Sequence, residues 1–122
     1  MRFFFVMMAM LAMTTAAIAA DFKSPILQLD GKPIPLSDTD KNPLTLGKVC
    51  SDALIAQLPG DTPSVDEKGE RFRLALKIIN RPQETLTANE VVLIKKVVGI
   101  AYGSLVVGRV NELLDPASVI PK

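Results

Sequence analysis

The fold class is decided by the segment Thr87-Ala-Asn-Glu-Val-Val-Leu-Ile-Lys-Lys-Val-Val98, which opens a long apolar run. This run is rich in β-branched residues, and its composition alone is compatible with a strand. Thr87 and Glu90, however, have the spacing of a capping box, in which each side chain accepts a hydrogen bond from the other residue's backbone N–H. The length of the run and its interruption by Lys95 and Lys96 also favour a helix. We therefore predict an amphipathic or largely buried helix here.

Hydrophobic periodicity and capping residues predict three or four packed helices in all. Thr45 caps the first of them, Arg81-Pro82 ends the second, and Ser104 caps the last. The predicted ranges are 46–58 for the first helix, 65 or 66 to 81 for the second and 105–114 for the last segment. The third helix follows the capping box at 87–90 and takes in the run 91–107, with a weakness or bend at Gly99 and Gly103.

The spacing of apolar residues also predicts which helix faces are buried. The stripe of the first helix contains Cys50, a thiol that we expect to act as a small apolar filler. A single Cys in an exported chain forms no internal disulfide, so bonding to a second chain stays the alternative. The predicted buried stripes are Leu46, Val49, Cys50, Ala53, Leu54 and Leu58 in the first helix, and Phe72, Ala75, Leu76 and Ile79 in the second.

A β-hairpin is predicted before the helices. Residues 25–29 and 32–36 alternate apolar and polar side chains around Asp30-Gly31, a dipeptide that suits a tight turn. Pro33 and Pro35 cannot donate to a ladder, so the second strand is either short or at an edge. The predicted fold class is therefore mainly α, with an N-terminal β-hairpin followed by three or four packed helices, which makes a small α+β domain.

The first residues resemble a secretory signal peptide. Met1-Arg2 is a short basic start, an apolar run follows, and Ala17 and Ala19 fit the small-x-small cleavage rule. We predict cleavage after Ala19, with the next residue or two as alternatives, and hence an exported protein that is periplasmic or secreted. This divides the chain into a signal peptide (1–19), one small helical domain with its hairpin (20–116) and a flexible tail (117–122). An uncleaved N-terminal membrane anchor is the alternative.

Charge and composition exclude several functions. The chain has 14 basic and 13 acidic residues, too balanced for the basic surface that nucleic-acid binding needs. It has no His, one Cys and few aromatic residues, so the usual groups for nucleophilic catalysis or zinc binding are missing. We predict no catalytic residue, no cofactor and no metal. The acidic residues are expected to serve turns and helix N-termini.

The glycines at 99 and 103 match the GxxxG pattern of packed membrane helices. Lys95 and Lys96 lie within one turn of Gly99, which argues against a membrane span. We therefore expect Gly99 and Gly103, with Gly108 beside them, to allow close packing of soluble helices.

The sequence as a whole predicts a small exported protein-interaction module that is not an enzyme and binds another protein or itself. An exposed hairpin edge is expected to accept a partner strand, and the last helix to supply a second contact. Two alternatives remain open: a membrane-tethered domain with an uncleaved N-terminus, and a small-molecule binder or enzyme that uses scattered carboxylates and lysines. The candidate interaction residues are Ile26, Leu27, Leu29, Leu105, Val106 and Val110.

The order of several segments resembles a group of small uncharacterised phage and prophage proteins. The likeness rests on Leu44-Thr-Leu-Gly47, on Leu105-Val-Val-Gly108 and on an opening Asp30-Gly31-Lys32 turn. It implies an interaction module and no catalytic residue. Proteins of that group typically lack an export signal. This chain, by contrast, begins with a segment that resembles one. The segments that carry the likeness are Leu44–Ala56, Glu70–Ile78, Leu93–Tyr102 and Leu105–Leu114.

Overall fold

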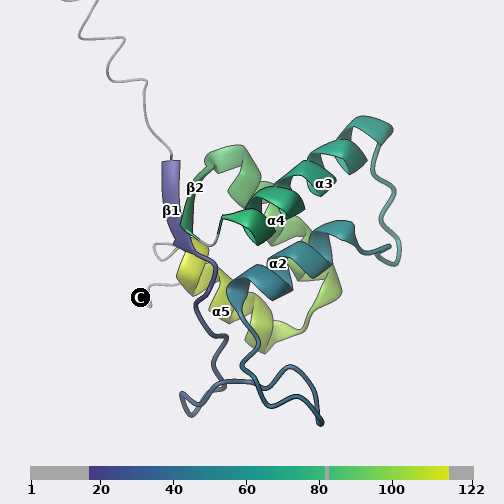
Figure 1. Ribbon diagram of the computed structural model, residues 1–122. Coiled ribbons are helices and arrows are strands. Elements are labelled where there is room, and N and C mark those ends of the chain that lie inside the picture. The colour runs from purple at the N-terminus through teal and green to yellow at the C-terminus, as the bar shows by residue number, and fades with distance from the viewer. Residues whose placement is uncertain (1–16, 82, 116–122) are drawn as a thin grey trace, which may run out of the picture.

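The computed structural model describes residues 17–81 and 83–115. Most of the predicted signal peptide and the predicted flexible tail lie outside these residues. Within them the chain is mainly helical with a small antiparallel β element, so the predicted fold class is confirmed (Figure 1). The elements, in chain order, are β1 (Ala17–Asp21), α2 (Leu46–Ile55), α3 (Val65–Asn80), β2 (Gln83–Thr87), α4 (Ala88–Ala101) and α5 (Ser104–Leu114).

Polar side chains start three of the helices. Thr45, Ser64 and Thr87 each accept a hydrogen bond from the backbone N–H three residues ahead, at 3.3, 3.1 and 3.2 Å. Glu90 accepts a bond of 2.9 Å from the N–H of Thr87, which completes the predicted capping box. The prediction that Ser104 caps α5 is wrong, because Ser104 is its first helical residue and the N-cap is a glycine without a side-chain bond.

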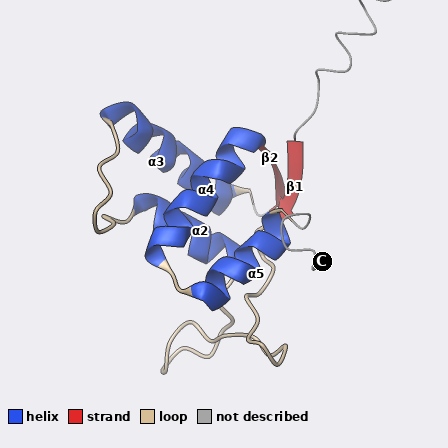
Figure 2. Cartoon of the chain, turned by 180° about the vertical axis from the view of Figure 1, so that it is seen from behind, coloured by secondary structure: helices blue, strands red, loops and turns tan. Residues whose placement is uncertain are grey.

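The two-stranded sheet joins the N-terminal end of the described chain to the segment between α3 and α4. β1 and β2 are antiparallel, with Ala17 opposite Thr87 and Asp21 opposite Gln83. Figure 2 shows both strands along one side of the helices. Neither strand follows from the sequence pattern, in which residues 17–19 belong to the predicted signal peptide and residues 83–87 carry no strand signal.

The predicted turn at Asp30-Gly31 is present, because Gly31 has φ +87° and the N–H of Gln28 donates to Lys32 O at 2.8 Å. The flanking residues form isolated bridges in place of a continuous ladder. The ladder does not continue because Pro33 and Pro35 have no N–H to donate. Three segments meet instead in a closed ring of backbone hydrogen bonds. The ring consists of Ile26 N–H to Leu44 O (2.8 Å), Leu44 N–H to Ile34 O (2.7 Å) and Ile34 N–H to Ile26 O (2.9 Å).

The hydrophobic core lies where α2 packs against α3 and α4. Five of the six residues predicted as the buried stripe of the first helix are buried, among them Cys50 and Val49 at 0% exposure. Leu58 is half-buried in the loop, because α2 ends at Ile55, three residues earlier than predicted. The buried apolar residues come from every element; in the helices they include Leu46, Leu54, Leu74, Ile78, Ile94, Val97, Val110 and Leu114.

Glycine allows one close approach in this core. The N–H of Gly47 donates to Phe22 O at 2.8 Å, and a Cβ at this position would lie 3.0 Å from the same oxygen. Gly99 and Gly103, by contrast, have open space around them. The predicted close packing at these two glycines is therefore wrong, and because α4 ends at Ala101 they do not share one helix.

Candidate interaction surface

The two segments that the sequence analysis nominated for binding are partly inside the fold. Ile26 and Val110 are completely buried, so the prediction that they belong to an exposed contact is wrong. Each lies on the side of its segment that faces the helices, where apolar side chains leave water. Leu29 is 89% exposed at the tip of the turn. The remaining predicted residues, Leu27, Leu105 and Val106, are half-buried.

Arg109 brings these two segments together. Its Nε donates to Leu27 O at 2.9 Å, and its Nη2 donates to Gln28 O at 2.6 Å. Its Nη1 also pairs with Glu112 at 3.0 Å. Since two carbonyls of the hairpin edge already accept hydrogen bonds from Arg109, this edge has less to offer a partner strand than the sequence analysis expected.

The most apolar exposed surface lies on α3 instead. Val65, Phe72, Leu76 and Ile79 are 83%, 57%, 44% and 60% exposed. They lie at positions i, i+7, i+11 and i+14, so they form one stripe along the whole helix. We call this stripe the α3 face. An exposed apolar stripe of this length is typical of a binding surface.

The α3 face was missed because the predicted buried stripe is displaced by one residue. The prediction placed Phe72, Leu76 and Ile79 in the core with Ala75, and it is wrong for the first three. The residues that α3 does bury have the same i, i+3, i+4, i+7 spacing but begin with a charged side chain, which hides the pattern. They are Arg71, Leu74, Ala75 and Ile78.

A network of charged side chains makes this orientation of α3 possible. Arg71 is 3% exposed, and its Nη1 lies 2.6 Å from Asp61 Oδ2 in the loop before the helix. Its Nη2 pairs with Glu67, one helical turn earlier, while Glu67 also accepts from Lys96 of α4 at 3.2 Å. A buried charge is tolerated when it is paired in this way. Among the described residues, Arg71 Nε has no hydrogen-bond partner.

The network shifts the ionisation of its members. The hydrogen bond from Arg71 lowers the pKa of Asp61, and hydrogen bonds from Arg71 and Lys96 lower the pKa of Glu67. The bond to Asp61 in turn raises the pKa of Arg71. All three groups are therefore charged at neutral pH, and their hydrogen bonds connect the loop before α3 to α3 and, through Lys96, to α4.

A cleft of about 680 Å³ adjoins the α3 face where α2 ends. Ile55, Leu58 and Phe72 form its apolar wall, and Lys68 and Arg71 are among its polar lining residues. Ile55 is 63% exposed, so the apolar surface extends from α3 onto the end of α2. The cleft offers room for a bulky apolar side chain from a partner.

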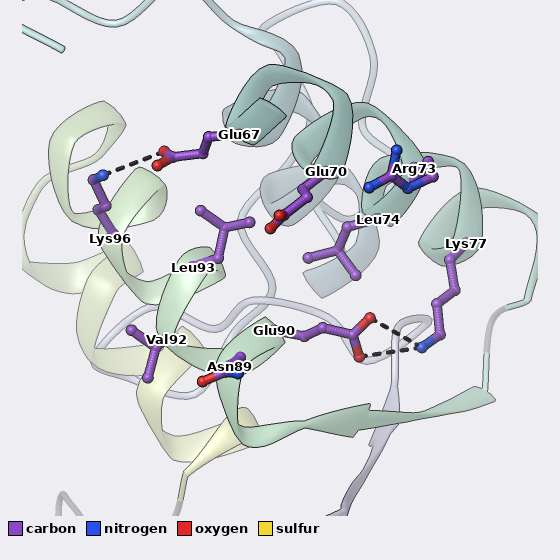
Figure 3. A pocket seen from close by; sticks show the side chains of 10 residues that line it. All are labelled: Glu67, Glu70, Arg73, Leu74, Lys77, Asn89, Glu90, Val92, Leu93 and Lys96. Atoms are coloured by element: carbon purple, nitrogen blue, oxygen red, sulfur yellow. Dashed lines mark hydrogen bonds and ion pairs between the residues drawn. The ribbon is translucent and has the colours of Figure 1, made fainter. Parts of the chain in front are cut away.

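A second groove, of about 390 Å³, runs between α3 and α4. Figure 3 shows an ion pair near each of its ends, Lys96 with Glu67 (3.2 Å) and Lys77 with Glu90 (3.1 Å). Glu70 lies between them. The carboxylates at both ends of the groove already have cationic partners, and these two ion pairs hold α3 and α4 together.

In residues 17–81 and 83–115, no three His, Cys, Asp or Glu side chains gather as a metal site would require. No helix in the same residues combines the length and the apolar character needed to cross a bilayer.

Cys50 is free and completely buried, and burial raises the pKa of its thiol to about 12. Because the thiolate is the reactive form, we expect Cys50 to resist alkylation by iodoacetamide in the folded protein at mildly alkaline pH. The rate should be about a thousandfold or more below that of an ordinary thiol. The same reagent should label it fully in concentrated guanidinium, as intact mass would show. Rapid labelling of the folded protein would contradict this position of the sulfur.

No protein-family model, curated protein or solved structure matches this chain. The resemblance to phage and prophage proteins therefore stays a prediction.

Proposed function

We propose that the chain is a small protein-interaction module that binds a protein partner through the α3 face and has no catalytic activity of its own. The observation that carries this proposal is that Phe72, Leu76 and Ile79 point away from the core on a helix that buries its opposite side. A free monomer would keep these side chains in water.

Burial of the α3 face would contribute favourably to binding. Fully burying one large apolar side chain is worth about 1.5–3 kcal/mol, and these side chains are about half exposed. Each should therefore add on the order of 1 kcal/mol when a partner covers it. The cleft beside Phe72 adds a place where one partner side chain can anchor, as interface hot spots commonly do.

Photo-crosslinking tests this proposal. We expect benzoylphenylalanine at Phe72 to give a discrete protein adduct in the native host cell, because this ring lies on the α3 face. The matched control carries the same group at Leu29, which is more exposed but lies on the hairpin turn. An adduct from position 72 alone supports the proposal. An adduct from position 29 alone, or none from either, would show that the α3 face is not the binding surface.

We propose in addition that the chain is exported, with a membrane-tethered form as the second candidate. Cleavage after Ala19 would remove three of the five residues of β1. An uncleaved N-terminus would keep the pairing of β1 with β2 whole, and this favours the tethered form. The intact mass of the protein from its host cell decides between them, since a mass that retains residues 1–19 is incompatible with cleavage.

A further inference from the structure

We infer that the partner that covers the α3 face is an amphipathic helix with carboxylates on both flanks of its apolar stripe. This inference rests on the proposed function and specifies the chemistry of the partner.

The shape of the surface fits a helix. The α3 face runs from Val65 to Ile79, which is about 21 Å at 1.5 Å per residue. Its apolar side chains recur at helical spacing, and the cleft beside Phe72 continues it into a groove. A partner helix that lies along such a groove contacts it with its residues at positions i, i+3, i+4 and i+7. The partner segment therefore needs about four turns with one bulky apolar residue opposite the cleft.

The charges around the α3 face favour an acidic partner. On the helix, Lys68 and Arg73 lie on opposite sides of the stripe near Phe72. Both are exposed, and neither forms an ion pair within residues 17–81 and 83–115. Of the acidic residues of α3, Glu67 is held by Arg71 and Lys96. Glu70 lines the groove to α4, as Arg73 also does (Figure 3). Asp66 is exposed in the first turn of the helix, about 10 Å along its axis from Arg73. Carboxylates on both flanks of a partner helix would complement these two cations.

The same charges disfavour a second copy of this chain as the partner. Two α3 faces packed antiparallel about Phe72 would bring Arg73 of each copy close together on one flank. A parallel arrangement would place Lys68 of one copy and Arg73 of the other on the same flank, on both sides of the interface. Like charges that face each other across an interface weaken it, so self-association through the α3 face is the disfavoured outcome.

Two synthetic helical peptides of about 18 residues test the inference directly. Both carry leucines at i, i+3, i+4 and i+7, and they differ only in having Glu or Lys on both flanks. We expect the Glu peptide to bind the purified protein, with NMR shift changes in α3 and near Ile55, and the Lys peptide to bind roughly tenfold more weakly. The preference should shrink at high salt, because the flanking pairs are exposed.

The decisive variant is K68E together with R73E, two exposed positions whose reversal should leave the circular dichroism spectrum unchanged. We expect it to bind the Lys peptide more tightly than the Glu peptide, a reversal of the wild-type preference. Leu76→Asp, which places a charge on the stripe itself, should weaken both peptides. A preference that does not reverse would overturn the acidic partner.

The outcomes also separate this inference from the proposed function. An adduct from position 72 in cells with no charge preference in the peptide experiment rejects the acidic helix but keeps the α3 face as a binding surface. An adduct whose mass is that of two copies of this chain rejects the acidic helix in favour of self-association. If neither adduct nor peptide binding is seen, both proposals fail.

Discussion

Replacing Arg71 by leucine should destabilise the fold by about 3 kcal/mol, the lower end of the cost of breaking a buried ion pair. The side chain of Asp61 is only 6% exposed and would lose its cation. The cost should not reach the upper end of that range, because Glu67 is more exposed and keeps Lys96. Urea unfolding followed by circular dichroism measures the change.

Two further variants make this measurement specific to the buried network. Arg73→Leu removes an exposed arginine from the same helix and should change the free energy of unfolding by less than about 0.5 kcal/mol. Adding Asp61→Asn to Arg71→Leu should recover part of the loss, because the uncompensated carboxylate is then gone. Equal losses for Arg71→Leu and Arg73→Leu would contradict the burial of Arg71.

The network should also make stability depend on pH. In the folded state, hydrogen bonds from Arg71 lower the pKa of Asp61 below its ordinary 3.8 and that of Glu67 below its ordinary 4.5. The unfolded chain therefore takes up protons first as the solution is acidified. The contribution of the network is present in full above about pH 4.5 and is lost as pH falls through the lower folded-state values. We expect the Arg71→Leu variant to lose less stability over the same acid range.

Replacing the two adjacent isoleucines of α3, Ile78 and Ile79, by alanine should change the free energy of unfolding by very different amounts. Ile78 is 2% exposed and Ile79 is 60% exposed. Ile78→Ala leaves a cavity where α3 packs against α2 and should cost about 2–4 kcal/mol in the free energy of unfolding. Ile79→Ala removes the same atoms from the α3 face and should cost less than about 0.5 kcal/mol.

This pair tests the orientation of the helix with a matched control, since both substitutions have the same chemistry and the same effect on helix propensity. The ratio of the two losses, measured by urea unfolding, reports which residue faces the core. If Ile79→Ala were the more damaging change, α3 would be turned as the sequence analysis predicted, and the α3 face would not exist.

Local signals in the sequence were sufficient for the helices and much of the core. Thr45 and the Thr87–Glu90 capping box mark helix starts because their hydrogen bonds reach only three residues along the chain. The buried stripe around Cys50 was predictable for the same reason, since one helix contains the whole pattern. The turn at Gly31 depends on its own backbone conformation.

Strand pairing and the binding surface depended on contacts between distant parts of the chain. β1 and β2 are separated by more than sixty residues, and neither five-residue segment carries a signal for its partner. The α3 face was predicted as core because Phe72, Ala75, Leu76 and Ile79 have the i, i+3, i+4, i+7 spacing of a buried stripe. The stripe that is buried begins instead with the charged Arg71. Burial of its charge becomes favourable only when the loop brings Asp61 to it and Glu67 lies one turn away.

The amino-acid sequence by itself thus determined where the helices begin and that the domain is mainly helical, because those properties follow from hydrogen bonds and periodicity within single segments. Only the tertiary structure decided which face of α3 is left for a partner. The physical reason is that the rotation of a helix depends on the energy of every group it buries, and for Arg71 that energy is set by Asp61, ten residues away in the chain.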